Sequence, residues 1–201
     1  MTTLDTLKQK FTEILSSVQR DNIASLITKL DESGFFESPA STAFHGCYPG
    51  GLVEHSLNVY QQAMYLKKIE THIRPSIADK LPDDSIKIAA LLHDVCKADI
   101  YKIEKKWRKD KDNKWEQYDA YVKDFTEFPL GHGEKSVIRL MKWGFPLTDD
   151  EMFAIRYHMG AWDLADYQDS RKCFDAACDK SPLASIIISA DWLASRITEQ
   201  F

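Results

Sequence analysis

Long apolar runs are absent from this 201-residue sequence. The longest, such as 88–92 and 186–188, are far too short to span a bilayer. Residues 1–10 are polar and contain no apolar segment of the kind found in signal peptides. We therefore expect a cytoplasmic protein with no membrane partner.

Metal-binding cysteine motifs and an excess of basic charge are also lacking. The four cysteines, at positions 47, 96, 173 and 178, show no CxxC spacing, which argues against zinc-ribbon and thioredoxin-like sites. The 26 basic and 31 acidic residues give a net charge of −5. This balance argues against a surface built entirely for nucleic acid but leaves room for a local basic patch. No repeat, low-complexity run or linker divides the chain, so we expect one domain.

Apolar residues recur with helical spacing through most of the chain. In the first 38 residues the pattern predicts two helices, with Asn22 capping the second and Gly34 ending it. Residues 101–122 instead alternate in polarity, which predicts a β-hairpin that turns at 110–113. We expect an all-α helical bundle, residues 1–201, with this hairpin inserted and a helical pair, residues 1–38, packed on it. Thr148-x-x-Glu151 forms a capping box that predicts the start of a helix at 148. In all, further helices are predicted over 52–69, 84–92, 134–143 and 148–160, and from 182 onward.

A few ionisable residues interrupt these apolar patterns. His93 and Asp94 end the apolar segment 88–92, and Lys97 faces the same side if that helix continues. Asp191 lies on the apolar face of the last helix, and His55 lies near the start of the third. Each alone is compatible with an ordinary core histidine, cap or ion pair. Together, imidazoles and carboxylates are the usual ligands of divalent metals, so they favour a metal site.

The context of these residues resembles the HD-domain phosphohydrolase superfamily over roughly residues 39–196. The matching segments are Gly-Gly-Leu-Val-Glu-His-Ser at 50–56, Leu-Leu-His-Asp-Val-Cys-Lys at 91–97 and Ser-Ala-Asp at 189–191. Cys96 stands where many members have glycine. The resemblance implies an HD-domain helical bundle and a first metal held by His55, His93, Asp94 and Asp191.

Two further histidines refine this resemblance. His132 precedes a predicted helix, and His158 lies near a helix end, so each alone fits a surface or capping role. A branch of the superfamily with two such histidines binds two metals. The resemblance therefore implies a second metal on His132 and His158, bridged by Asp94, with a mononuclear site as the alternative. Iron, manganese, magnesium, nickel, cobalt and zinc all suit these ligands.

The resemblance implies a phosphomonoesterase or phosphodiesterase that hydrolyses nucleotides or other small phosphate esters through a metal-activated water. The catalytic residues would be Asp94 and Lys97. The ammonium of Lys97 could bind a phosphate oxygen, or Lys97 could be a surface lysine paired with Asp94 or Asp99. The first alternative is a 3′-to-5′ exonuclease or phosphodiesterase on short or cyclic nucleotides. Residues 39–55 resemble the HD domain of a bacterial exoribonuclease family, but this chain lacks room for that family's oligonucleotide-binding domain. The second alternative is a non-catalytic nucleotide-binding sensor.

The predicted hairpin carries an unusual charge. Residues 101–114 contain seven basic and three acidic side chains, a net +4 against −9 for the rest of the chain. Trp107 and Trp115 flank the turn, and basic residues interleaved with aromatics suit a phosphate chain and a base. A short single-stranded nucleic acid is therefore a candidate partner beside a small phosphorylated substrate. The alternative is a solvated hairpin whose lysines protect an exposed edge.

Overall fold

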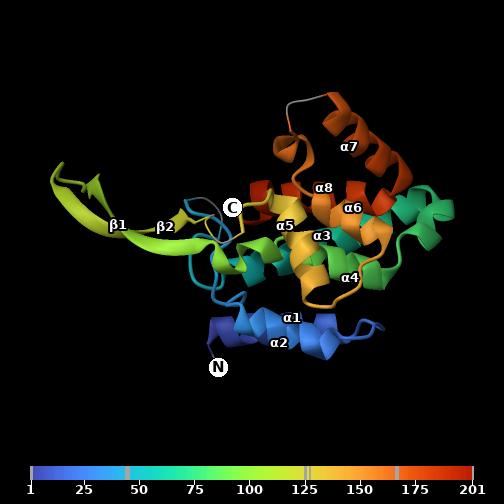
Figure 1. Cartoon of the computed structure of the whole chain (residues 1–201), viewed down its shortest axis with the longest axis horizontal. Coiled ribbons are helices and arrows are strands. Elements are labelled where there is room, and N and C mark those ends of the chain that lie inside the picture. Colours follow the sequence, from blue (N-terminus) through green and yellow to red (C-terminus); the bar gives the residue numbers. More distant parts are fainter. Residues whose placement is uncertain (1, 44–45, 125, 127, 166–167, 201) are drawn as a thin grey trace.

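Figure 1 shows a computed structural model of the chain, which describes residues 2–43, 46–124, 126, 128–165 and 168–200. Within these residues, helices form the body and a two-stranded antiparallel hairpin projects from it. The expected all-α fold with an inserted hairpin is therefore confirmed. Among the described residues, no helix is both long and apolar enough to cross a membrane.

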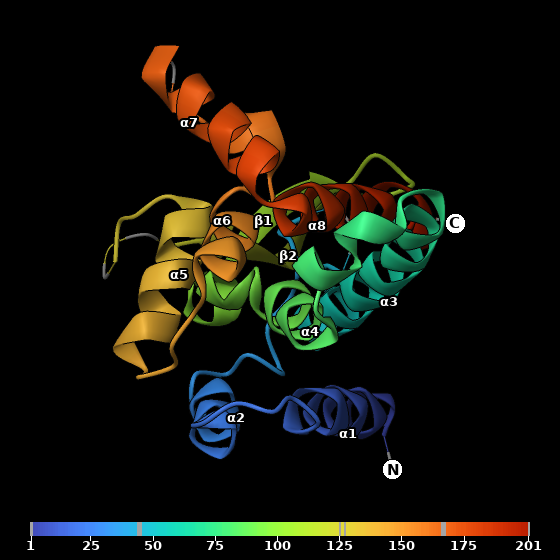
Figure 2. The same ribbon diagram turned by 90° about the vertical axis from the view of Figure 1, so that its right-hand side faces the viewer.

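The first two helices, α1 (Thr3–Ser16) and α2 (Ile23–Glu32), lie on one side of the body, where α1 contacts the central helices (Figure 2). Phe11 of α1 meets Phe35 and Phe36, which follow α2, with ring centroids between 5.2 and 5.5 Å apart. All three rings are fully buried, and the same hydrophobic core continues into the central helices. These aromatic contacts fix α1 against the segment that follows α2.

The two ends of α2 differ in how well the sequence predicts them. Gly34 follows α2 with a φ of +75°, the left-handed conformation expected of a helix-ending glycine. Asn22 does stand at the N-cap position, but its φ is +67° and its side chain makes no cap. Instead its amide nitrogen donates to the carbonyl oxygen of Gly144 at 3.1 Å. The expected side-chain cap was wrong because a tertiary contact captures the amide.

Helix α4 (Asp83–Leu92) lies at the centre of the body, in contact with α3 (Gly51–Ile73), α6 (Asp149–Arg156) and α8 (Pro182–Leu193). Residues 88–92 are completely buried, as the uniformly apolar sequence predicts. A 3₁₀ helix, η1 (Pro75–Lys80), joins α3 to α4, and a second, η2 (Val95–Asp99), follows α4. The chemistry-bearing doublet at 93–94 therefore sits where the most buried helix ends.

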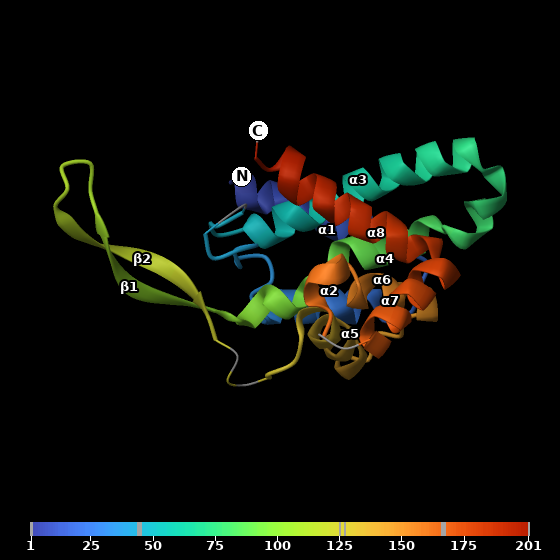
Figure 3. The same cartoon turned by 90° about the horizontal axis from the view of Figure 1, so that it is seen from above.

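The hairpin consists of β1 (Tyr101–Lys109) and β2 (Trp115–Lys123), paired so that Tyr101 faces Lys123 and Lys109 faces Trp115. Figures 1 and 3 show it as an arm reaching away from the helices. Its turn occupies 110–113 as predicted, with Asp110 accepting hydrogen bonds from the backbone amides of Asp112 and Lys114. The strand boundaries thus agree closely with the alternation in the sequence.

The C-terminal half agrees less well with the predicted boundaries. Helix α5 (His132–Lys142) matches, and the Thr148–Glu151 capping box forms, but α6 ends at Arg156 rather than near Gly160. The short η3 (Gly160–Asp163) and the helix α7 (Gln168–Lys180), which stands away from the body in Figure 2, were not predicted. Helix α7 buries only Ser170 and Ala177 within a mostly polar sequence, so it carries little apolar periodicity.

The last helix changes its winding near its end. Helix α8 passes into a π-helix, η4 (Ala194–Thr198). The extra residue per turn rotates the following side chains, and Ile197, which the 3.6-residue period places on the apolar face, is 56 % exposed. This change of period also redirects the residues that follow, including Glu199.

A buried ion pair connects residues 1–38 to the body and gives a test of that packing. The guanidinium of Arg20 binds both oxygens of the fully buried Glu151 at 2.8 and 2.9 Å, and Ser85 donates to the same carboxylate at 2.7 Å. We expect Glu151→Ala to lower the free energy of unfolding by about 3 kcal/mol, because it leaves charged and polar groups unpaired. Urea unfolding measures this loss. Glu32→Ala, which removes an exposed pair with Lys29, should change stability by less than about 1 kcal/mol. Equal losses in the two variants would contradict the assigned role of Glu151.

Candidate metal centre

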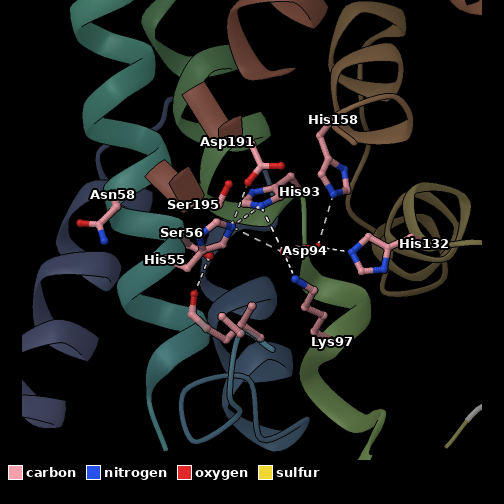
Figure 4. A network of polar contacts seen from close by, with 12 residues as sticks. His55, Ser56, Asn58, His93, Asp94, Lys97, His132, His158, Asp191 and Ser195 are labelled. Atoms are coloured by element: carbon pink, nitrogen blue, oxygen red, sulfur yellow. Dashed lines mark hydrogen bonds and ion pairs between the residues drawn. The ribbon is translucent and has the colours of Figure 1, made fainter. Parts of the chain in front are cut away.

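The His93–Asp94 doublet is positioned by the end of α4. His93 is the C-cap residue, and the backbone leaves the helix at Asp94, with φ −106° and ψ 18°. Their side chains are 0 % and 2 % exposed. The Nδ1 of His93 lies 2.8 Å from the carbonyl oxygen of Ala90, so Nδ1 carries the proton and Nε2 faces the interior. The helix end thus aims both groups into one buried space (Figure 4).

His55 and Asp191 reach this space from α3 and α8. Nε2 of His55 lies 3.2 Å from Asp191 Oδ1 and 3.2 Å from Nε2 of His93. A glycine lets α3 begin where it does, because a Cβ at Gly51 would stand 2.0 Å from the carbonyl oxygen of Gly46. The Gly-Gly pair therefore permits the close loop that sets His55 on the buried side of the first turns of α3.

His132 and His158 approach from the opposite side (Figure 4). Nε2 of His132 lies 2.6 Å from Asp94 Oδ1, and Nε2 of His158 lies 3.4 Å from the same oxygen. A Cβ at Gly133 would stand 2.1 Å from the carbonyl oxygen of Arg156, so glycine permits the close approach of α5 and α6. That contact places the start of α5 beside the end of α6, and so brings the two imidazoles together.

The two oxygens of Asp94 face different groups of partners. Oδ1 faces His132 and His158, whereas Oδ2 lies 3.3 Å from Nε2 of His93 and 3.7 Å from Nε2 of His55. The structure thus brings all six candidate ligands into one cluster around this carboxylate. Sets of potential ligand atoms within 4.8 Å of one another include His55–His93–Asp191 and His93–Asp94–His158.

The donor and acceptor balance of this cluster fits cations. His158 donates Nδ1–H to the carbonyl oxygen of Ile155 at 2.7 Å, which leaves a lone pair on its Nε2. That Nε2 atom is buried and has no hydrogen-bond partner, since the 3.4 Å approach to Asp94 does not make a hydrogen bond. The Nε2 atoms of His93 and His158 therefore face carboxylate oxygens of Asp94 without a proton between them. Such a set suits divalent ions such as zinc, iron or manganese.

Burial and charge shift the pKa values of the cluster in opposite directions. Burial raises the pKa of Asp94, but the Lys97 ammonium and the neighbouring imidazoles outweigh it and hold that pKa well below its usual range. Burial lowers the pKa of His55, yet hydrogen bonds to Asp191 and Glu199 raise it to about 10. Burial lowers the pKa values of His93 and His132. His55 also lowers the pKa of Asp191, so without metal Asp94 and Asp191 are ionised and His55 carries a proton.

Lys97 lies in the cluster, although α4 does not continue to it. The helix ends at Leu92, as the sequence predicts, and the 3₁₀ helix η2 turns the side chain of Lys97 toward Asp94. Its Nζ lies 2.6 Å from Asp94 Oδ2, and the residue is 8 % exposed. Although burial opposes the charge, Asp94 raises the pKa of this ammonium above its usual value. Lys97 thus carries the positive charge nearest to Asp94 Oδ2.

Glu199 is a further residue of the site that sequence reasoning missed. Its Oε1 and Oε2 lie 2.9 and 3.2 Å from Nδ1 of His55, and Asn58 donates to Oε1 at 3.0 Å. A carboxylate bound to the outer nitrogen orients a ligand imidazole and increases its basicity. No local pattern marks Glu199, because it reaches His55 only after the π-helix η4 turns the chain.

A cavity of about 1150 Å³ opens beside the cluster. Its lining includes Asp94, Lys97, His132, His158 and Asp191, and also Trp162 and Trp192. These tryptophans are 78 % and 50 % exposed, and the guanidinium of Arg196 lies 5.0 Å from the Trp192 ring centroid. The candidate metal centre is thus reached through an opening that carries aromatic surface and positive charge.

Comparison with known proteins gives one match. A family model described as HD domain matches residues 52–196, which is more than half of the chain. Neither the curated proteins nor the solved structures include a match to this chain. The matched range contains all six candidate ligands and Lys97, and it ends before Glu199.

The proton on His55 gives a pH dependence for metal binding. Because the pKa of His55 is raised to about 10, a cation that binds its Nε2 near neutral pH must displace that proton. Apparent affinity should therefore rise with pH, by about tenfold per unit for one released proton. Titration calorimetry with Mn²⁺ at pH 6, 7 and 8, in buffers of different ionisation enthalpy, measures both quantities. Equal affinity across this range would contradict proton displacement at His55.

Removing the charge of Glu199 tests its effect on His55. We expect Glu199→Gln to weaken Mn²⁺ binding by about 10- to 100-fold, because the imidazole loses its outer carboxylate. Glu70→Gln makes the same change near the other end of α3 and should leave the affinity unchanged. Calorimetry compares the variants, and similar binding by wild type and Glu199→Gln would remove Glu199 from the site.

Proposed function

The chain belongs to the HD domain family, and from this premise we propose that it is a divalent-metal-dependent phosphohydrolase acting on nucleotides or other small phosphate esters. The observation that carries the proposal is the buried Asp94 carboxylate, with one oxygen facing His132 and His158 and the other facing His93 and His55. Burying a cluster of this kind without a cation costs folding free energy. Its presence beside an open cavity favours catalysis over a purely structural role.

We assign the ligands to two cation sites. His55, His93, Asp94 and Asp191 would hold the first ion, and His132 and His158 the second, with Asp94 shared. The separation of partners between the two Asp94 oxygens supports this assignment. When bound, two divalent cations supply positive charge that activates water and stabilises charge on phosphoryl oxygens.

The residues of the chain then have distinct tasks. Asp94 connects the two proposed cation sites, since one of its oxygens faces His55 and His93 and the other faces His132 and His158. Lys97 neutralises Asp94 Oδ2 in the metal-free protein. With divalent cations on that carboxylate, the ammonium would be available to bind a phosphate oxygen of the substrate as a compact cation. Asp94 and Lys97 are accordingly the proposed catalytic residues.

The cavity has room for a nucleotide, because its volume of about 1150 Å³ slightly exceeds the range of ordinary ligand sites. The exposed rings of Trp162 and Trp192 offer stacking surfaces for a base. The cavity also opens toward the hairpin. This opening favours a second candidate function, a phosphodiesterase or 3′-to-5′ exonuclease that acts on short or cyclic nucleotides. That residues 1–201 form a single domain stays a prediction, and so does the cytoplasmic location.

Metal content and turnover together test the site assignment. We expect wild type to bind two Mn²⁺ per chain, Asp94→Ala to lose both ions with its hydrolysis, and His132→Ala to retain one. His72→Ala, which removes an exposed histidine from α3, should keep both ions and full activity. Elemental analysis measures the ions. Turnover is followed by phosphate release from mononucleotides and by cleavage of bis(p-nitrophenyl) phosphate.

The outcomes separate the candidate functions. Phosphate release from mononucleotides supports a phosphomonoesterase, and cleavage of the diester alone supports a phosphodiesterase. Tight nucleotide binding without turnover in any of several metals would instead indicate a sensor. Wild-type turnover by Asp94→Ala would show that the site is wrongly assigned. A single ion per chain, unchanged in His132→Ala, would reject the second cation site.

A further inference from the structure

The two faces of the projecting hairpin differ in character. Because side chains alternate along a strand, each face carries every second residue of β1 and its partners on β2. We call one of them the tryptophan face. It comprises Tyr101, Ile103, Lys105, Trp107 and Lys109 of β1, with Trp115, Gln117, Asp119, Tyr121 and Lys123 of β2.

The tryptophan face exposes large apolar side chains. Ile103, Trp107 and Trp115 are 64 %, 61 % and 65 % exposed, although tryptophan is normally well buried. A two-stranded hairpin has no second layer of its own that could cover these rings. Figures 1 and 3 show that the arm leaves the helical body, so the helices do not cover them either. Exposed aromatic surface of this kind is typical of a binding surface.

The base of the tryptophan face continues into the cavity. Tyr101 and Lys123, which pair at the start of the hairpin, both line the cavity that contains Asp94. Tyr101 is held there by a hydrogen bond from its hydroxyl to the carbonyl oxygen of Ala40 at 3.1 Å. The ring of Tyr121 follows, 6.2 Å from that of Tyr101. An extended ligand can therefore pass from the candidate metal centre onto the arm without leaving this face.

The charge of the hairpin suits an anionic ligand. Residues 101–123 carry eight basic and five acidic side chains, a net +3, which leaves −8 on the rest of the chain. On the tryptophan face, Lys109 lies 5.6 Å from the Trp115 ring centroid, and Lys105 pairs with Asp119 at 2.6 Å. Lysines thus alternate with aromatic rings along the path that leads to the cavity.

From these observations we propose that the tryptophan face binds a single-stranded oligonucleotide whose end lies in the cavity. The bases stack on Trp107 and Trp115, and the lysines attract the phosphates. Nine residues per strand span about 30 Å, room for several nucleotides. The inference that the bound end is a substrate rests on the proposed function, whereas binding on the arm does not.

A second copy of the chain is the competing occupant, since the remainder of the protein is acidic. The oligonucleotide is favoured because the tryptophan face runs into the cavity and because Trp162 and Trp192 repeat the aromatic surface at the cavity itself. A surface used for dimer formation has no need of this continuity.

Fluorescence anisotropy with 5′-labelled dT10 and U10, in EDTA to prevent hydrolysis, tests the binding. We expect Trp107→Ala/Trp115→Ala to bind both oligonucleotides at least tenfold more weakly than wild type, since stacking on each ring contributes about 1–3 kcal/mol per base. Tyr118→Ala is the matched control. It removes an aromatic ring from the opposite face, where the ring contacts Arg108, and should bind like wild type.

Further measurements keep the outcomes separate. Circular dichroism confirms that the variants fold, and hydrolysis of a small phosphate ester by the double variant should equal that of wild type. Equal oligonucleotide binding by wild type and the double variant overturns the inference, as does a wild type that binds neither oligonucleotide. If wild type forms a dimer and binds no oligonucleotide, and the double variant is monomeric, the tryptophan face binds a second copy. This result also overturns the inference. Oligonucleotide binding that depends on both tryptophans, without hydrolysis in any metal, supports the inference while rejecting the proposed function.

Discussion

The burial of one carboxylate, Asp94, determines how this protein is built. An ionised carboxylate in a helical core is strongly unfavourable unless cations or hydrogen-bond donors surround it. Here the Lys97 ammonium, the protonated His55 and Nε2 of His132 supply that environment. His55 and His132 come from elements far from Asp94 in the chain. The helices must therefore close around Asp94 for its charge to be tolerated, which couples the folding of the body to the formation of the site.

The backbone makes this closure possible through close contacts and fixed imidazole orientations. Gly51 and Gly133 stand where a Cβ would overlap a carbonyl oxygen, so two chain segments meet more closely than side chains would allow. His93 and His158 each donate Nδ1–H to a carbonyl oxygen three residues earlier, and His55 is held by Glu199. Each of these contacts holds an Nε2 atom toward the centre, so the imidazoles are oriented before any ion arrives.

The other parts of the chain divide the remaining tasks. Helices α1 and α2 extend the hydrophobic core, and no described residue of either lines the cavity. The hairpin contributes Tyr101 and Lys123 to the cavity and otherwise projects from the body. The N-terminal helices thus add to the stability of a core that lies mainly in the central helices. The centre carries the candidate metal ligands, and the arm, as we propose, contacts an extended ligand.

Short-range patterns in the sequence predicted much of this protein. Apolar periodicity, the Thr148–Glu151 capping box and the alternation at 101–122 gave the helical bundle and its hairpin, because those features depend on neighbours a few residues apart. The resemblance of three short segments gave the family and the proposed ligands. The end of α6, the helix α7 and the role of Glu199 were missed, and the side chain of Asn22 was assigned wrongly. Those features, and the division of partners between the two oxygens of Asp94, were decided only by the tertiary structure. Each depends on contacts between residues distant in sequence, which local periodicity does not encode.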